Sequence, residues 1–521
     1  MRVAVSELLA RREGRGIVGA FLLVSLCFTG QFPPFANPNE ASRYAAVFAA
    51  VESGTFRIDD ALPVVGQTED KSVSEGHFYS NKAPGLALAA TPVYRALRVF
   101  FPRPSSAFAP IWVLLRILVV TSVCCVAFER LRRRLATRNP AAASLVVAAL
   151  AFGTPLLFYG RSFFSHAWTA ALLFLSLEAI RRAEAASAPR RAGALLWAAG
   201  FLAGWAAISE YPVALLAGLL LVRAAARGAF RNGAIFAAGL VLPLAVLMTY
   251  DAICFGSPFV LSSAREALPE FSQLAGTGLF GFRLPDPRVA AGLLFHPARG
   301  LFLFSPFLLW AVPGFLKWRR SGEDRADRTF CLAGCVVFFV AMCAYPNWHG
   351  GWSLGSRYLM PILFFLSLAV ARALDSPRSR WLFAGAAAFS IGVHSLEALA
   401  WPYFPLALAW PPRTGSLWFL QNGWLAPAQP GIPALIALAV ALAAAAVALA
   451  AVGSGEEAAR RRSLLAVAGG LLIFVATLVV APEPSKEGRQ FREGILARRM
   501  ESAIRAAAGG RPRADGARAA R

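Results

Sequence analysis

Cysteine, histidine and acidic residues are scarce in this chain of 521 residues. It contains 7 cysteines, 5 histidines and 29 aspartates and glutamates, against 52 lysines and arginines. All the cysteines lie within apolar runs, and no two of them have the spacing of a zinc site. These scarcities exclude a disulfide framework and a structural zinc centre as the basis of the fold.

Longer-range regularities are missing as well. The sequence has no repeat of fixed period, no soluble domain of useful size and no glycine-rich loop of the kind that holds a nucleotide. What it has instead is apolar sequence, since 57% of the residues are hydrophobic and the mean hydropathy is +0.55. That share exceeds the roughly half-apolar composition of a soluble domain. We therefore predict an all-α, polytopic membrane protein.

A net charge of +23 is the second abundant feature. On one soluble face such a charge would suggest a nucleic-acid partner, but here the basic residues fall in short clusters between apolar runs. This is the positive-inside pattern of a membrane protein, so we predict no nucleic-acid partner. The clusters are Arg11 to Arg15, Arg130 to Arg138, Arg181 to Arg191, Arg223 to Arg231, Lys317 to Arg328, Arg372 to Arg380, and Arg460 to Arg462.

About thirteen apolar runs can cross a bilayer when each basic cluster is placed on the cytoplasmic side. The N-terminus then lies inside and the C-terminus outside, and the first run is a retained helix rather than a cleaved signal peptide. We expect a transmembrane domain over 1–481, with a first outer loop at 37–106, followed by a basic, largely disordered tail at 482–521. The expected spans are 16–36, 107–128, 140–159, 165–181, 192–209, 211–226, 233–254, 300–317, 329–345, 357–373, 381–402, 431–452 and 463–481.

The first outer loop should carry two juxtamembrane helices that lie along the membrane surface. The stretch 83–101 is apolar, but letting it cross would turn the basic cluster at 130–138 to the outside, so we expect it to lie in the interface. The other helix, at 39–52, has an apolar face at helical spacing that is formed by Tyr44, Val47, Phe48 and Val51.

The outer loop opens with Asn37-Pro38-Asn39-Glu40, which has the pattern of a helix start. Asn37 would be the N-cap, and the carboxylate of Glu40 in the first turn would reach back to a free backbone amide. A carboxylate at the outer face of a membrane can instead act as a general base, and the two roles are compatible.

Lys82 in the same loop also has two interpretations. An interfacial lysine commonly extends its ammonium toward lipid head groups, whereas in a functional site the ammonium would contact a phosphate. Four loop acids, Asp59, Asp60, Glu69 and Asp70, are of the type that binds a divalent cation, but their irregular spacing equally fits solvated acids. The metal ligands, and the need for any cofactor, stay open.

The segment 345–361 places aromatic residues, glycines and one arginine at the outer end of a predicted helix. An aromatic belt explains Trp348, and an anchor at the helix end explains Arg357. The same residues suit a sugar- or lipid-binding rim, because a guanidinium can contact a phosphate through two hydrogen bonds. Arg161 with His166, and Arg299, occur in similar smaller arrangements.

Several ionisable residues lie in the outer loops, at the helix ends that face them or in the outer half of a span. A transporter would need such groups near the middle of the membrane, so their distribution favours an outward-facing site. The residues concerned are His77, His166, His296, His349, His394, Glu210, Asp251 and Glu397.

Taken together, the layout resembles the integral-membrane glycosyltransferases of the GT-C superfamily, in particular the protein O-mannosyltransferase and lipid A aminoarabinose transferase group. The likeness lies in one helix, a long outer loop that opens with an acid in NPNEASRY, a lysine-proline motif, and about a dozen further helices. The motifs of this chain depart from the family pattern at two places. Asn39 replaces the first of two acids, so that only Glu40 is kept, and Lys82-Ala83-Pro84 replaces Lys-Pro-Pro.

The resemblance implies a sugar donor linked to polyprenyl phosphate, membrane lipids as surroundings, and a glycan, lipid or protein acceptor at the periplasmic face of a bacterial inner membrane. The missing nucleotide loop agrees with such a donor. Glu40 is the candidate base, and Lys82, Arg357, Arg161 and Arg299 are the candidate contacts of the donor phosphate. The candidate substrate-binding residues are Asn37, Asn39, Arg43, Tyr44, Asp70, His77, Tyr79, Asn81, His166, Trp348, His349 and Tyr358.

Two other functions stay open at this point. A lipid-linked oligosaccharide transporter would carry charged residues along the middle of several spans and broken helices in matching halves. A non-catalytic scaffold of an envelope assembly complex would leave the acids and histidines of the outer loops without a cavity to serve.

Overall fold

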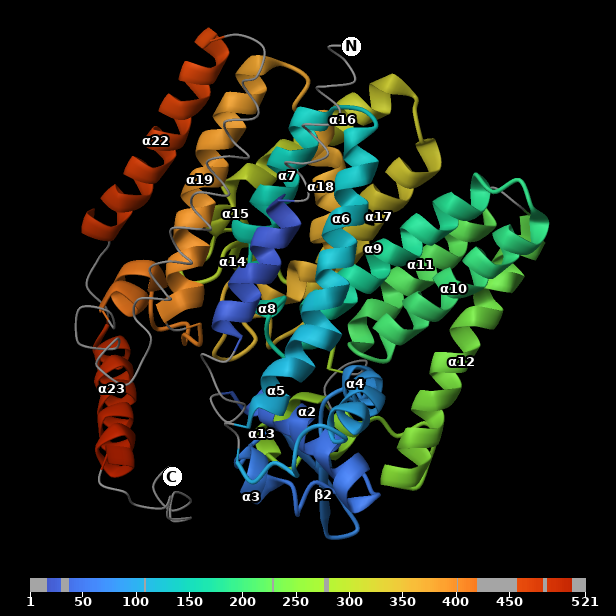
Figure 1. Ribbon diagram of the computed structural model, residues 1–521, viewed down its shortest axis with the longest axis vertical. Coiled ribbons are helices and arrows are strands. Elements are labelled where there is room, and N and C mark those ends of the chain that lie inside the picture. Colours follow the sequence, from blue (N-terminus) through green and yellow to red (C-terminus); the bar gives the residue numbers. More distant parts are fainter. Residues whose placement is uncertain are drawn as a thin grey trace.

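The computed structural model describes residues 16–29, 37–106, 109–226, 229–275, 281–400, 402–418, 457–480 and 485–507. This part of the chain is a bundle of helices with a smaller helical layer at one end, and its sheet is a single hairpin (Figure 1). The predicted all-α fold of a polytopic membrane protein is confirmed.

Each expected span within the described residues contains helix, whereas the span expected at 431–452 lies outside them. Four of these helical segments are long and apolar enough to cross a membrane as single rods: Pro110–Ala136, Phe230–Phe255, Arg325–Cys343 and Arg461–Val479. The helices of the bundle are Gly16–Phe28, α5 (Pro110–Leu115) with η3 (Arg116–Thr121) and α6 (Ser122–Ala136), α7 (Pro140–Phe152), α8 (Leu156–Tyr159), α9 (Ser165–Glu184), α10 (Pro189–Ala207), η4 (Tyr211–Val213), α11 (Ala214–Ala225), α12 (Ala229–Phe255), α15 (Leu301–Phe304), η6 (Pro306–Trp310), α16 (Ala311–Ser321), α17 (Arg325–Cys343), η7 (Arg357–Ile362), α18 (Leu363–Arg372), α19 (Pro377–Ala400), η8 (Pro412–Leu417) and α22 (Glu457–Val480).

Five expected spans are interrupted or change helix type. The run 140–159 breaks between α7 and α8, the run 300–317 changes between α15 and α16, the runs 211–226 and 357–373 start as the 3-10 helices η4 and η7, and the run 107–128 contains the π-helix η3. A proline lies at the first four of these irregularities, at Pro155, Pro306, Pro212 and Pro361. Proline removes a backbone donor and clashes with the preceding turn, so an α-helix rarely passes through it unchanged.

The first outer loop forms the helical layer at the end of the bundle (Figure 1). It consists of α2 (Pro38–Phe48), η2 (Ala49–Ser53), α3 (Leu62–Val65), β1 (Lys71–Ser74), β2 (His77–Ser80) and α4 (Gly85–Leu97). Both juxtamembrane helices are present where the sequence predicts them. Asn37 caps α2, because its side chain accepts a hydrogen bond from the backbone amide of Asn39.

The hairpin β1–β2 was not predicted from the sequence. Its two strands pair antiparallel around Glu75 and Gly76, whose φ angles of 51° and 79° both lie in the left-handed region. A two-residue loop with that backbone matches the twist of a hairpin, and glycine in its second position is the usual signal. The sequence Ser74-Glu75-Gly76-His77 carried this signal.

The long outer loop after α12 returns to the hairpin. It contains η5 (Ser262–Arg265), α13 (Pro269–Ala275) and α14 (Pro287–Phe295). Glu266 forms a β-bridge with Ser72, and the amide of Ala267 donates to the carbonyl of Lys71 at 2.9 Å. The loop therefore extends β1 on its open edge.

Helices α10 and α12 lie in unusually close contact through glycines. A Cβ atom added at Gly200 would come within 1.9 Å of the carbonyl oxygen of Phe236, and one at Gly239 within 2.0 Å of that of Trp197. The end of α10 holds α4 in the same way, since a Cβ atom on Gly85 would lie 2.8 Å from the amide of Ser209. Only glycine allows these backbones to approach so closely.

The basic clusters meet at the opposite end of the bundle, around Asp327. This carboxylate at the start of α17 is 2% exposed and pairs with Arg134 of α6 at 2.6 Å, Arg181 of α9 at 3.0 Å and Arg223 of α11 at 2.6 Å. Glu178 and Glu184 of α9 complete the network with Arg134 and Arg223. Four helices thus place their basic ends on one side of the bundle, as the positive-inside pattern requires.

The tail begins with α23 (Lys486–Ala507), and 508–521 lie outside the described residues. Helix α23 lies toward the end of the molecule that carries the first outer loop (Figure 1). It packs through Phe491 on Trp352 and through Arg492 on the ring of Trp418. The tail thus starts with a helix, and the disorder expected for the rest of it stays a prediction.

Labelling of single cysteines should show which side of the membrane each end faces. We expect a cysteine at exposed Gln67, in a Cys27→Ser background, to react with an impermeant reagent added from the periplasmic side. A cysteine at Ser187, in the basic connection between α9 and α10, is the matched control and should react from the cytoplasmic side alone. The reverse pattern at the two positions would contradict the topology.

Candidate active site

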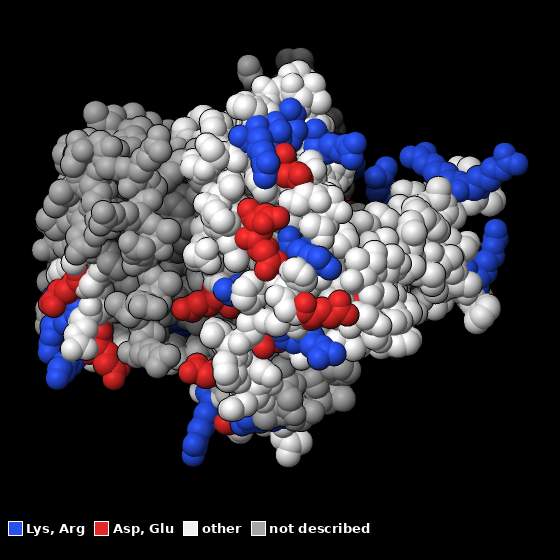
Figure 2. All heavy atoms as spheres, turned by 90° about the horizontal axis from the view of Figure 1, so that it is seen from below, with Lys and Arg blue, Asp and Glu red and all other residues white. Residues whose placement is uncertain are grey.

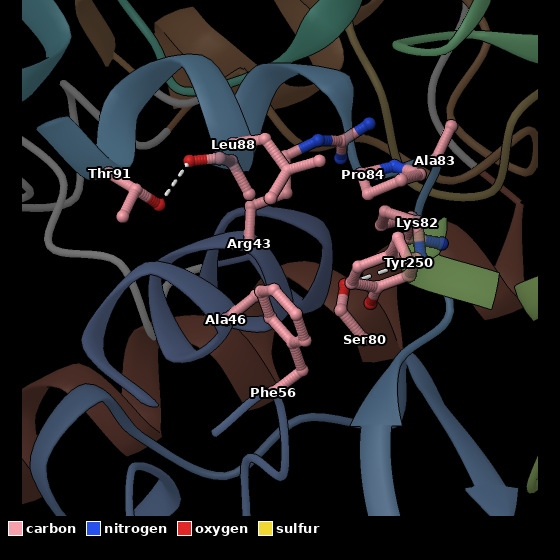
Figure 3. A pocket seen from close by; sticks show the side chains of 11 residues that line it. Arg43, Ala46, Phe56, Ser80, Lys82, Ala83, Pro84, Leu88, Thr91 and Tyr250 are labelled. Atoms are coloured by element: carbon pink, nitrogen blue, oxygen red, sulfur yellow. Dashed lines mark hydrogen bonds between the residues drawn. The ribbon is translucent and has the colours of Figure 1, made fainter. Parts of the chain in front are cut away.

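Two cations from the first outer loop enter one narrow pocket. Arg43 of α2 and Lys82, which follows β2, line it together with Ser80 (Figure 3). The remaining wall is mainly apolar and comes from α2, the loop after η2, the start of α4 and the outer end of α12. Its residues are Ala46, Phe56, Ala83, Pro84, Ala87, Leu88, Thr91 and Tyr250. Seen from this end of the molecule, acidic and basic side chains lie side by side over the centre (Figure 2).

Arg43 is 2% exposed and is held by polar groups of three elements. Its guanidinium donates to the side chain of Asn39 in α2, to Ser165 Oγ of α9 at 2.5 Å, and to Glu210 Oε1 at 3.3 Å. Ser165 also donates to the same oxygen of Glu210, and His166 Nδ1 lies 3.5 Å from it. The start of α9 and the turn before η4 therefore orient the guanidinium at the pocket.

Lys82 and Asn81 each face a carboxylate. The ammonium of Lys82 lies 3.0 Å from Asp70 Oδ1, and the side-chain amide of Asn81 donates to Glu266 Oε2 at 2.7 Å. Asp70 and Glu266 come from either side of the hairpin, one before β1 and one from the loop after α12. Sequence reasoning placed Asp70, Asn81 and Lys82 in the site, and the structure brings these three together.

Arg357 forms the third cationic group of this region. Its guanidinium contacts the hydroxyl of Tyr358 at 3.4 Å and lies over the rings of Tyr358 and Phe164. Among the described residues it makes no ion pair. It lies near enough to Glu210 and Arg43, however, to lower the pKa of both groups. A half-buried guanidinium without a carboxylate partner is well suited to an anionic ligand.

Glu40 lies apart from the pocket, on the inner face of α2. Its side chain is 1% exposed, and both oxygens are occupied. Oε1 accepts from the amide of Phe163 at 2.5 Å and lies 3.2 Å from Arg116 Nη2, while Oε2 accepts from Tyr403 at 3.1 Å. The expected contact back to the start of α2 is replaced by these contacts. The catalytic role of Glu40 stays a prediction.

Arg161 and Arg299 are held by backbone carbonyl oxygens rather than facing the pocket. Arg161, which is 2% exposed, donates to the carbonyls of Phe28 and Ala398. Arg299, which is 1% exposed, donates to the carbonyls of His349 at 2.7 Å and Phe404 at 2.6 Å. Both guanidinium groups thus join irregular segments of the bundle, and the structure gives neither a contact with the pocket.

The other predicted substrate-binding residues are dispersed. Tyr44 is buried under Arg116, and Tyr79 packs in an apolar cluster with Tyr250. His77 stays at the surface beside Asp59. Trp348 contacts the ring of His296, and His349 Nδ1 accepts the amide of Gly351 at 3.1 Å. Of the predicted set, Asn37, Asn39, Arg43, His166 and Tyr358 lie at or directly behind the cationic region.

Two carboxyl groups of the region were not among the predicted site residues. Burial raises the pKa of Glu210, but His166, Arg43 and Ser165 act against burial and bring the pKa below its usual value. Burial raises the pKa of Glu266 to about 7, even though Lys82 and Asn81 lower it. Glu210 stands alone between two apolar runs, and the sequence already placed it among the outer-side ionisable residues without assigning it to the site. Glu266 lies in a polar loop and had no such signal.

The acids considered for a divalent cation do not converge. Asp59 accepts from the amide of Phe78 at 3.2 Å, and Asp70 is paired with Lys82. Within the ranges that the structure describes, no three side chains of histidine, cysteine, aspartate or glutamate meet at a common position.

No family model matches the chain, and no curated protein gives a significant sequence match. Among solved structures, ArnT from Cupriavidus metallidurans in the apo state has a TM-score of 0.51 and 17% sequence identity, and the match covers 88% of this chain and 75% of that chain. The same protein bound to undecaprenyl phosphate gives 0.47 at 16% identity, covering 86% and 77%. The oligosaccharyltransferase AglB from Archaeoglobus fulgidus, in complex with an inhibitory peptide and a dolichol-phosphate, gives 0.42 at 14%, covering 88% and 56%.

An identity of 17% is too low to carry over a substrate, but the match to apo ArnT extends over most of both chains. The match therefore concerns the arrangement of the helices over most of the chain, not a single segment. The chain therefore shares the fold of apo ArnT.

Proposed function

We propose that this protein is a membrane glycosyltransferase that moves a sugar from a polyprenyl-phosphate donor to an acceptor at the periplasmic face of the bacterial inner membrane. The observation that carries the proposal is the pocket that Arg43 and Lys82 share with an apolar wall. The resemblance of the outer-loop motifs to GT-C enzymes supplies the donor class. A lipid-linked phosphate has the two properties that such a pocket matches, an anionic head and an apolar chain.

The head group would meet Arg43, Lys82 and Arg357. Negative charge develops on the phosphate as its bond to the sugar breaks, so cations held in place beforehand stabilise the transition state. Lys82 now pairs with Asp70, whose side chain is 16% exposed, and Arg43 pairs with Glu210. A phosphate entering the pocket would compete with these carboxylates for the cations.

The lipid chain would follow α12. This helix exposes Val241, Leu244, Met248 and Ile253 along its length, and its outer end places Tyr250 in the pocket wall. An apolar surface that leads from the lipid toward a cationic pocket allows a carrier to bind without leaving the membrane.

The proposal is tested with purified protein in vesicles that contain a polyprenyl-phosphate-linked sugar and a mixture of envelope acceptors. We expect release of the lipid phosphate together with a glycosylated acceptor, both followed by mass spectrometry. Movement of the intact donor across the bilayer without transfer would indicate a transporter instead. Neither transfer nor movement, in protein that still binds its envelope partners, would indicate a scaffold.

Lys82→Ala and Arg357→Ala should each weaken donor use while the protein stays folded. Removing one charge-assisted contact costs about 1.5–3 kcal/mol, which corresponds to roughly one to two decades in affinity. Transfer at limiting donor measures this loss. Arg57→Gln, at an exposed arginine of the same loop, is the matched control and should leave transfer unchanged. Wild-type transfer by both alanine variants would show that neither side chain contacts the phosphate.

A further inference from the structure

The proposed reaction needs a group that takes a proton. An oxygen of the acceptor hydroxyl forms a bond to the anomeric carbon of the sugar. The bond between that carbon and the phosphate oxygen breaks, and its electron pair leaves with the polyprenyl phosphate. The hydroxyl proton must pass to a base, and in proteins a positioned carboxylate often has this role.

Three of the carboxylates in this region are held by cations. Glu40 contacts Arg116, Asp70 contacts Lys82, and Glu210 contacts Arg43. A cation at contact distance occupies the oxygens of a carboxylate through a strong, charge-assisted contact, so an incoming hydroxyl would have to displace it.

Glu266 is a further carboxylate near the pocket, and its environment differs. Oε2 accepts a hydrogen bond from the amide of Asn81, and Oε1 has no hydrogen-bond partner in the described part of the chain. Burial raises the pKa of Glu266, Lys82 and Asn81 lower it, and Asp70 raises it further, so that it lies at about 7. A base is most effective when its pKa is near the working pH.

The backbone around Glu266 is fixed beside the pocket. Ser72 Oγ donates to the carbonyl of Ser262 at 2.7 Å, and Ser262 Oγ donates to the carbonyl of Asn81 at 3.0 Å. Together with the bridge between Ser72 and Glu266, these contacts hold the loop after α12 against the hairpin. Lys82 follows the second strand of that hairpin. The carboxylate is therefore held next to the residues that would contact the donor.

We propose that Glu266 is the general base that receives the proton of the acceptor hydroxyl. The inference rests on the proposed glycosyl transfer. The products are the glycosylated acceptor, the polyprenyl phosphate and protonated Glu266, which returns its proton to water before the next turnover.

Glu266→Gln tests the proposal directly. Glutamine keeps an acceptor for the Asn81 amide but cannot take a proton, so transfer should fall by about 10²–10⁴-fold while donor affinity stays as in the wild type. The wild-type rate should rise with pH through about 7 as Glu266 loses its proton, and the glutamine variant should lack this rise. Glu270→Gln, at an exposed position of the same loop, is the matched control and should behave as the wild type.

Glu266→Asp gives a second measurement that does not depend on how the glutamine variant folds. It keeps the carboxylate but shortens its reach, so the rate should drop while the rise with pH is retained. Wild-type turnover and an unchanged pH profile in Glu266→Gln would overturn the assignment of Glu266 and leave glycosyl transfer standing. Absence of transfer in the wild type, with donor and acceptor bound, would overturn the proposed function and this inference together.

Discussion

Glu40→Gln should lower the stability of the protein by about 3–5 kcal/mol, because it removes the charge of one partner of a buried ion pair. Glu40 and Arg116 are 1% and 4% exposed in their side chains and lie 3.2 Å apart. Glutamine can still accept hydrogen bonds from Phe163 and Tyr403, so the loss of charge is the main change. The measurement is the thermal midpoint of the detergent-purified protein, with Glu69→Gln on the exposed loop as control.

The double variant Glu40→Gln/Arg116→Gln separates the structural role of Glu40 from the predicted catalytic one. Removing both charges restores electrical balance, so stability should recover most of what the single change loses. If the only role of Glu40 is to pair with Arg116, the transfer rate should recover together with the stability. A double variant that is stable but slower than the wild type by about a hundredfold or more would instead establish Glu40 as the base and count against Glu266.

Asp327→Asn should have an effect of comparable size at the other end of the bundle. Asp327 is the shared partner of Arg134, Arg181 and Arg223, and its loss leaves three guanidinium groups with the two carboxylates of Glu178 and Glu184. Removing one partner of a buried ion pair lowers the stability by about 3–5 kcal/mol.

The same thermal assay measures this loss, and the yield of folded protein in the membrane gives an independent reading. Asp375→Asn is the matched control, since that carboxylate is 48% exposed and lies 3.7 Å from Lys317. Its substitution should change stability by less than about 1 kcal/mol. Equal thermal midpoints for Asp327→Asn and Asp375→Asn would show that the network does not hold the four helices together.

The helices could be predicted from the sequence because the bilayer imposes local rules on the chain. Apolar runs set the helix positions, and basic clusters set the side of each end, without knowledge of any tertiary contact. The helix at 39–52 followed from its own periodicity, and its cap at Asn37 followed from residue type. The hairpin was equally local, and its Glu-Gly turn could have been read.

The partners of the charged side chains could not be predicted in this way. Arg43, Arg161, Arg299 and Arg357 are the same residue type in similar apolar surroundings, yet two contact backbone carbonyls, one contacts Glu210, and one makes no ion pair among the described residues. Their partners lie far away in the sequence, and no spacing rule connects such segments. Glu40 shows the same limit, since its partner Arg116 comes from a different helix.

The glycine contacts of α10 have a mechanical consequence. Because α12 and α4 are both held against α10 with no space for even one added carbon, the three helices behave as a single stiff frame. Two walls of the pocket belong to this frame, so the pocket cannot widen by spreading them. Any change in its width therefore has to come from the lining outside this frame, which is supplied by α2, Phe56, Ser80 and Lys82.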